Sequence, residues 1–150
     1  TEGVGLGIWE ADVSTHDARW SESQFRIFGL APTADGQVPG GTFSARLHPE
    51  DLAPVLAAAA EARATGGVFS PEYRIRRADT GELRWVAAFG RVIQQAGGGD
   101  RDRFVGITLD ITDRKRLEAE REGLLESERA ARSAAEAATR AKDEFLATLS

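Results

Sequence analysis

The residues with the clearest chemical potential in this chain are two pairs of carboxylates. Glu50 and Asp51 are adjacent, and Glu10 and Asp12 stand two positions apart. Paired acids can divide proton-transfer work, one acting as general acid and the other as general base. Here the first pair falls at the expected start of a helix and the second on an expected strand, where capping and solvation account for them. No catalytic constellation remains, and we assign no catalytic residue.

The sequence also lacks the usual carriers of covalent and metal chemistry. It contains no cysteine, which excludes a disulfide, a thiolate metal site and a cysteine nucleophile. Of the histidines, His16 lies in an expected turn and His48 just before an expected helix. Gly97-Gly98-Gly99 is not followed by a helix or by a Gly-Lys-Ser/Thr ending, so it is not a phosphate-binding loop. We therefore expect no metal site in this chain.

Length and composition predict one compact domain with an appendage. The chain has 150 residues, of which 41% are hydrophobic, and its net charge of −5 argues against binding nucleic acid through phosphate contacts. No apolar run approaches the ~20 residues of a membrane span, so we expect a cytoplasmic segment without membrane contact of its own. Since methionine is absent, we expect Thr1 to be an internal cut point of a longer parent protein, which can carry spans elsewhere.

The best-defined junction is a strand that passes directly into a helix. Apolar residues alternate with small or polar ones over 105–111, which is the period of a strand with one buried face. From Thr112 to Ser150 there is no proline and one glycine, Gly123, among good helix formers. We expect Thr112 or Asp113 to cap this helix, and any strain in the sheet must reach the helix through these few residues.

Turn and periodicity signals predict the other elements. We expect a short strand over 6–13, a helix capped by Ser21 and Gln24 that ends at Gly29, and a loop over 31–42. A long helix is predicted from about Asp51, its expected N-cap, after a turn at His48-Pro49, to Gly66-Gly67. Alternation then predicts strands over 69–76 and 83–90 around the turn 79–81, with a looser hairpin loop at 97–100. The layout is α+β, with helices grouped against one sheet.

An ordered set of motifs resembles the PAS family of sensor domains. Its members, in family order, are Gly7-Ile8-Trp9-Glu10-Ala11-Asp12, Trp20-Ser21 with 25–30, His48-Pro49-Glu50-Asp51, Glu72-Tyr73-Arg74-Ile75 with 81–86, and Asp110-Ile111-Thr112. One motif would be weak, but the set covers about residues 4–115 in order. The resemblance implies a PAS domain over 1–112, with a five-stranded antiparallel sheet and helices on one face.

The end of the chain resembles the segment that precedes the phospho-accepting histidine of sensor histidine kinases. The run from Ala141 to Ser150 is Ala-Lys-Asp-Glu-Phe-Leu-Ala-Thr-Leu-Ser, and the family continues with His-Glu-Leu-Arg-Thr-Pro. The resemblance implies a signalling linker helix over 113–140 and the truncated start of the dimerisation and phosphoacceptor helix over 141–150. It also implies that the parent is an ATP-dependent protein histidine kinase whose partner is a response regulator.

A heptad pattern runs along the predicted helix. Its members recur every seven positions or complete the last repeat: Leu117, Leu124, Ala131, Ala138, Phe145 and Leu149. This spacing is typical of a coiled coil and predicts a parallel homodimer. The second column is polar in the two early repeats and alanine knobs bury little area, so a long solvated helix with an accidental alanine stripe is the alternative.

The PAS resemblance also implies roles for two groups of residues. It makes Asp110, Thr112 and Asp113 a signal joint, in which Asp110 binds a basic residue such as Arg114 or Arg84. A solvated carboxylate at the strand end is the alternative. It also implies a pocket between the helices and the inner face of the sheet, although the sequence does not fix which strand parity faces inward and such residues more often form the core. The candidate lining residues are Tyr73, Ile75, Trp85, Phe89 and Ile107.

The resemblance leaves the cofactor open. The light-sensing flavin branch of the family needs a cysteine for its photoadduct, and this chain has none. The haem branch needs an axial histidine on the long helix, and residues 50–66 contain none. A non-covalent flavin, a small metabolite and an empty pocket remain compatible. The alternatives to a sensory and dimerising kinase module are therefore a cofactor- or metabolite-binding PAS sensor and a plain dimerisation module.

Overall fold

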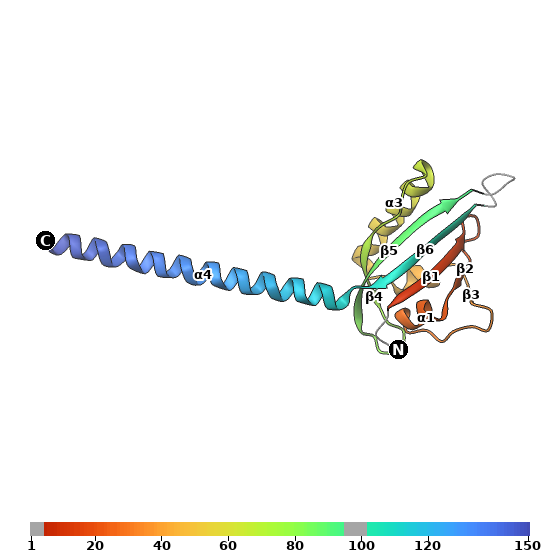
Figure 1. Cartoon of the computed structure of the whole chain (residues 1–150), viewed down its shortest axis with the longest axis horizontal. Helices are drawn as coiled ribbons and strands as arrows, with labels where there is room; N and C mark the ends of the chain where they lie inside the picture. Colours follow the sequence, from red (N-terminus) through yellow and green to blue (C-terminus); the bar gives the residue numbers. More distant parts are fainter. Residues whose placement is uncertain (1–4, 95–101) are drawn as a thin grey trace. The chain divides into compact units, whose positions relative to one another are not determined.

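The first part of the chain is built on a six-stranded antiparallel sheet. The computed structural model describes residues 5–94 and 102–150, and it divides into two units, Thr1–Thr112 and Asp113–Ser150. The strand order is β3-β2-β1-β6-β5-β4 (Figure 1). The strands are β1 (Leu6–Asp12), β2 (Ala18–Trp20), β3 (Gln37–Val38), β4 (Glu72–Arg76), β5 (Leu83–Ile93) and β6 (Arg103–Asp110).

The sheet therefore has six strands where five are predicted. The additional strand, β3, lies in the predicted loop over 31–42, where Gln37 pairs with Arg19 and Val38 with Ala18. A strand of two residues is too short to show alternation, which is why the sequence did not indicate it. The hairpin loop predicted at 97–100 lies outside the described residues.

Helix α1 (Glu22–Phe28) begins and ends where the sequence predicts. The Ser21 hydroxyl accepts the N–H of Gln24 at 3.3 Å, and Gly29 closes the helix in the left-handed region with φ 72°. Only this half of the predicted capping box forms. The N–H of Ser21 already donates to the carbonyl of Ile8 at 2.9 Å, so Gln24 has no free amide to reach back to.

Helix α3 (Pro49–Thr65) begins three residues earlier than predicted. Its N-cap is His48, whose Nδ1 accepts the N–H of Glu50 at 3.1 Å. Asp51, the predicted cap, lies inside the first turn and binds Arg74 of β4 instead. The helix ends before Gly66, which has φ 74°, as predicted. A shorter helix, α2 (Thr42–Arg46), precedes it.

One face of the sheet, which we call the inner face, packs against α1 and α3 and forms the core. Strand register places on this face Trp9, Tyr73, Ile75, Val86, Ala88, Phe104 and Thr108. These side chains pack with Phe25, Phe28 and Val55 of the two helices. Burial of this aromatic and aliphatic surface is the main term that stabilises the first unit.

Aromatic rings fill the middle of the inner face. The Trp9 ring lies 5.5 Å from that of Phe104 and 6.3 Å from that of Phe69, and the two phenylalanine rings are 5.1 Å apart. The indole lies over glycines of two neighbouring strands, because a Cβ on Gly90 would come within 2.7 Å of Trp9 Cη2 and one on Gly106 would also overlap the ring. Glycine at these positions is what lets the ring approach the two strands this closely.

Thr108 on the inner face has a buried hydroxyl that we predict to be dispensable. The residue is 1% exposed, and no hydrogen bond reaches its Oγ1 from the residues that the structure describes. A buried polar atom without a partner costs about 1–3 kcal/mol, and valine has the same shape. Thr108→Val should therefore leave the free energy of unfolding unchanged or raise it by about 1 kcal/mol, measured by urea unfolding. A clear loss of stability would show that the hydroxyl has a partner after all.

The second unit consists of one helix. Helix α4 spans Thr112–Leu149, and its first residue still belongs to the first unit. Between residues 5 and 94 and between 102 and 150, no helix combines the length and apolar character needed to cross a bilayer.

Candidate functional site

Asp110, at the end of β6, accepts hydrogen bonds from two sides. Its Oδ2 accepts from Nε and Nη2 of Arg84 at 3.0 and 2.8 Å. Its Oδ1 accepts from the backbone N–H of Thr112 at 2.9 Å and from the Thr112 hydroxyl at 2.6 Å. The Asp110 side chain is only 14% exposed, so it is not a solvated strand-end carboxylate. Of the two basic residues considered, Arg84 binds it, whereas Arg114 pairs with Glu118 at 3.5 Å.

Thr112 connects the same joint to the neighbouring strand β5. Its Oγ1 accepts the N–H of Trp85 at 3.0 Å, and the carbonyl of Trp85 accepts the N–H of Ile111 at 2.9 Å. A hydroxyl has one proton and two lone pairs, so Thr112 can donate to Asp110 and accept from Trp85 at once. Both main-chain polar groups of Trp85 are therefore used to hold Ile111, the residue before α4, and Thr112, its first residue.

The first amide of α4 is capped by Asp110. The predicted caps were Thr112 and Asp113, and the Thr112 hydroxyl binds Trp85 and Asp110. Asp113 lies in the first turn of α4, where a negative charge favours the positive end of the helix dipole. Its side chain is 92% exposed. The cap therefore comes from the end of the strand, which makes strand end and helix start one hydrogen-bonded group.

Electrostatics keep the Asp110 carboxylate charged. Partial burial raises the pKa of Asp110, but the hydrogen bonds from Thr112 and the ion pair with Arg84 lower it more strongly, so the pKa lies below its ordinary value of 3.8. Arg84 also pairs with Glu82 at 3.2 Å. At neutral pH the joint therefore holds a permanent ion pair inside a hydrogen-bonded strand end.

Comparison with known proteins identifies the family of this domain. Residues 17–108 match the family model described as the PAS fold. The chain belongs to the PAS family. This match covers more than half of the chain and agrees with the α+β fold predicted from the motifs.

Two relatives of this PAS domain are a histidine kinase and a sensor protein. The chain is similar to the blue-light-activated histidine kinase of Brucella anthropi, with 32% identity over 120 residues, 80% of this chain and 23% of the relative. It is also similar to the sensor protein FixL of Bradyrhizobium diazoefficiens, with 29% identity over 117 residues, 78% of this chain and 22% of the relative. The chain thus spans less than a quarter of the length of these relatives.

A solved structure shows the same fold. The sensory box histidine kinase/response regulator from Burkholderia thailandensis superposes with a TM-score of 0.69 and 27% identity, over 85% of this chain and 92% of that chain. This similarity extends over most of both chains and agrees with the PAS fold of residues 17–108.

The five candidate pocket residues of the PAS domain do not come together. Tyr73 and Ile75 lie on the inner face and are 1% and 0% exposed. Register places the other three, Trp85, Phe89 and Ile107, on the opposite face, which we call the outer face. The reason is the register of the β4–β5 hairpin, in which Tyr73 faces Val86 rather than Trp85. Alternation shows which residues of one strand share a face, but it does not show which residues of the neighbouring strand lie on that same face.

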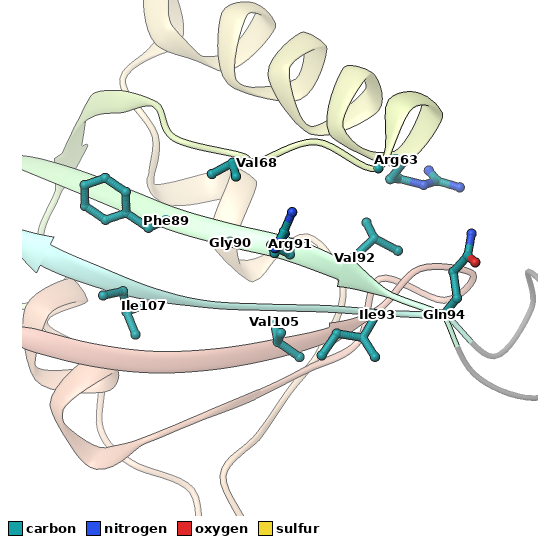
Figure 2. A pocket seen from close by; sticks show the side chains of 11 residues that line it. Arg63, Val68, Phe89, Gly90, Arg91, Val92, Ile93, Gln94, Val105 and Ile107 are labelled. Atoms are coloured by element: carbon teal, nitrogen blue, oxygen red, sulfur yellow. The ribbon is translucent and has the colours of Figure 1, made fainter.

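Two of these residues, Phe89 and Ile107, line a hollow of about 900 Å³ that runs alongside β5 (Figure 2). Val68 and Val105 add to its apolar lining, and Arg63 at the end of α3 lies beside it. Tyr73 and Ile75 do not line this hollow. The interior of the PAS domain is instead occupied by the aromatic rings described above.

Two contributors near the joint were missed by reasoning from the sequence. The main chain of Trp85 holds Thr112 and Ile111, and main-chain groups have no signature in residue types. Arg74 lies directly opposite Trp85 on β4, with its guanidinium carbon 5.4 Å from the centre of the indole. The hairpin turn at 79–81 indicates that β4 and β5 pair, but the pairing of Arg74 with Trp85 also depends on the register, which the sequence does not give.

The residues of the predicted seam lie along α4 and are exposed to solvent. The exposed fractions of Leu117, Leu124, Phe145 and Leu149 are 65%, 69%, 62% and 68%. Ala131 and Ala138 are exposed as well. A helix of this length with an uncovered apolar stripe has surface available for a partner helix.

Proposed function

We propose that this chain is the sensory and dimerising module of a two-component sensor histidine kinase, and that it passes the state of the PAS domain through α4 to the kinase. The joint is the observation that supports this proposal most strongly. Asp110, at the end of β6, binds the side chain of Arg84 in β5 and the first amide of α4, and Thr112 binds the main chain of β5. The similarity to a blue-light-activated histidine kinase and to a sensor protein supports the same function.

The energy of the joint suits a switch. A hydrogen bond to a charged group contributes about 1.5–3 kcal/mol, and a helix cap about 1 kcal/mol. A tenfold change in the ratio of two states requires about 1.4 kcal/mol. Forming or losing part of the joint is therefore enough to bias the population of two arrangements of α4.

We further propose that α4 forms a parallel homodimeric coiled coil over 113–140 and continues over 141–150 into the dimerisation helix of the kinase. The heptad seam and its exposure support this proposal. Alanines in the seam, such as Ala131 and Ala138, bury little area, so the two helices can rotate or shift register at low cost. The parent kinase then acts on a response regulator, and we place it in the cytoplasm, because such a kinase draws on cytoplasmic ATP.

Replacing Leu124 with aspartate should convert the dimer into monomers. A charge in the middle of the seam must be desolvated on association, which is unfavourable. Sedimentation of the wild-type chain should give a dimer and that of Leu124→Asp a monomer, with a parallel loss of autophosphorylation in the parent kinase. Ala119→Asp introduces the same charge off the seam and serves as control. A monomeric wild-type chain, or equal dimerisation of both variants, would contradict the coiled coil.

A further inference from the structure

We infer that Arg74 is a positioning residue of the joint, which connects the start of α3 to Trp85 and, through Trp85, to Thr112. The inference deepens the proposed function and rests on it, because it names the residue through which a displacement of α3 reaches the joint. Three consecutive contacts carry it, and each is made by a different part of Arg74 or Trp85.

The first contact is between Arg74 and Asp51 in the first turn of α3. Asp51 Oδ2 accepts from the backbone N–H of Arg74 at 2.8 Å and from its Nε at 2.9 Å, while Oδ1 accepts from Nη2 at 2.6 Å. The two side chains are 24% and 17% exposed. Paired charge-assisted bonds of this kind fix both distance and orientation, so the guanidinium plane must follow the helix start.

The second contact is made by the main chain of Arg74. Strand β4 is at the edge of the sheet, so one side of it has no neighbouring strand. On that side the N–H of Arg74 donates to Asp51, and its carbonyl accepts the N–H of His48 at 2.9 Å. The start of α3 thus completes the hydrogen bonding of this edge residue, and it cannot move without disturbing Arg74.

The third contact is between the Arg74 guanidinium and the indole of Trp85. The two residues are directly paired across β4 and β5, and the guanidinium carbon lies 5.4 Å from the ring centre, within the range of a cation–π interaction. The N–H of Trp85 then donates to Thr112. Helix α3, Arg74, Trp85 and the joint therefore form one uninterrupted series of contacts.

Through this series of contacts, a displacement of α3 can reach the joint. Helix α3 covers the inner face, where its Val55 and Ala62 are 2% exposed and belong to the core cluster. A change in core packing that moves α3 must move Asp51 and, with it, the guanidinium that lies against Trp85. Lysine cannot replace arginine here, because it lacks the planar fork that binds a carboxylate in two places and packs against a ring.

Native-state amide exchange of the chain, measured by NMR, tests the inference. The reporters are the amides of Trp85 and Ile111, which are bonded to Thr112 and to the Trp85 carbonyl. Arg74→Lys and Arg74→Gln should each accelerate exchange at these two amides by roughly fivefold, because the contact that restrains Trp85 is lost. A merely structural role of Arg74 would lower the stability of the whole domain without singling out these amides.

Arg77 provides a matched control. It binds Asp79 through Nε and Nη2 at 3.0 and 2.8 Å, and its side chain is 21% exposed, so its pairing resembles that of Arg74. Arg77 donates to the carbonyl of Arg26 in α1, and not to α3. Arg77→Gln should leave the Trp85 and Ile111 amides unchanged. If it accelerates them as much as the Arg74 variants do, or if those variants have no effect, the inference is overturned.

Failure of the inference can be separated from failure of the proposed function. If the Arg74 variants accelerate exchange at the two amides but the parent kinase that carries them keeps its wild-type activity, the positioning role stands and the signalling role of the joint is contradicted. If the amides do not respond but substitutions of Asp110 still change kinase activity, the joint keeps its role and the inference about Arg74 alone is overturned.

Discussion

Asparagine in place of Asp110 is expected to lower the free energy of unfolding of the PAS domain by about 2–3 kcal/mol. The carboxylate accepts two hydrogen bonds from Arg84 and two from Thr112, so all four groups that face it are donors. An amide offers one accepting oxygen, so its NH₂ group must face either Arg84 or Thr112 with a donor against a donor. Urea unfolding at pH 7 measures the loss.

The same variant should show a defined pH dependence. The folded pKa of Asp110 lies below 3.8, so the stability that its charge contributes is fully present above about pH 5 and is lost as the pH falls below about 4 through the folded pKa. The stability difference between wild type and Asp110→Asn should therefore be constant from pH 7 to 5 and shrink in acid. The pKa values of Asp51 and Asp79 are also lowered, mainly by hydrogen bonds from Arg74 and Arg77 respectively. Both proteins contain these two residues, so their contributions cancel in the stability difference.

Glu82→Gln is the control for the ion pair. Glu82 also pairs with Arg84, but its side chain is 43% exposed, and exposed ion pairs contribute about 0–1 kcal/mol. Glu82→Gln should therefore lower the free energy of unfolding by much less than Asp110→Asn does. Equal losses, or a stability difference for Asp110→Asn that grows in acid, would contradict the role assigned to the Asp110 carboxylate.

Replacing Trp9 with alanine is expected to have the largest effect on the core. The indole lies against Phe69 and Phe104 and covers two glycines of the sheet, so its removal leaves a hole that backbone atoms line. Tryptophan-to-alanine changes in cores cost about 3–5 kcal/mol. Because Trp9 is only partly buried, we expect about 3 kcal/mol, measured by urea unfolding, with Trp9→Phe as the milder control.

The hole left by Trp9→Ala should accept a small aromatic molecule. Apolar cavities made by truncating a large side chain can bind benzene-sized ligands. Indole added to the variant should raise its melting temperature, whereas the wild-type domain, whose inner face is filled by the Trp9 ring, should not respond. If the wild-type domain binds indole as well as the variant does, its inner face contains a cavity, which would contradict the close packing of Trp9, Phe69 and Phe104.

The part of the joint that side chains build could be predicted from the sequence. Alternation over 105–111, followed by uninterrupted helix formers, located the strand-to-helix passage, and Asp110 with Arg84 was one of the two pairings considered. Glycine positions with φ 72° and 74° ended α1 and α3 as predicted, since the left-handed conformation selects for glycine. These features depend on residue type at one position, which a single sequence displays.

Features that depend on pairing between segments were beyond the sequence. The five candidate pocket residues fall on two faces, because the register of the β4–β5 hairpin sets which strand parities coincide. Strand β3 has only two residues and exists through its pairing with β2. Asp51 was predicted to cap α3, but Arg74 competes for its carboxylate and His48 takes the capping role. In each case a tertiary contact outweighs a local preference.

The most direct measurement compares autophosphorylation of the parent kinase with that of its Asp110→Asn and Thr112→Ala variants, at a temperature where all PAS domains remain folded and all chains remain dimeric. If the joint passes the state of the PAS domain to α4, both variants should change the rate by about fivefold or more, because each removes about 1 kcal/mol of joint energy or more and 1.4 kcal/mol corresponds to a tenfold shift of a two-state population. Wild-type rates in both folded, dimeric variants would contradict the account.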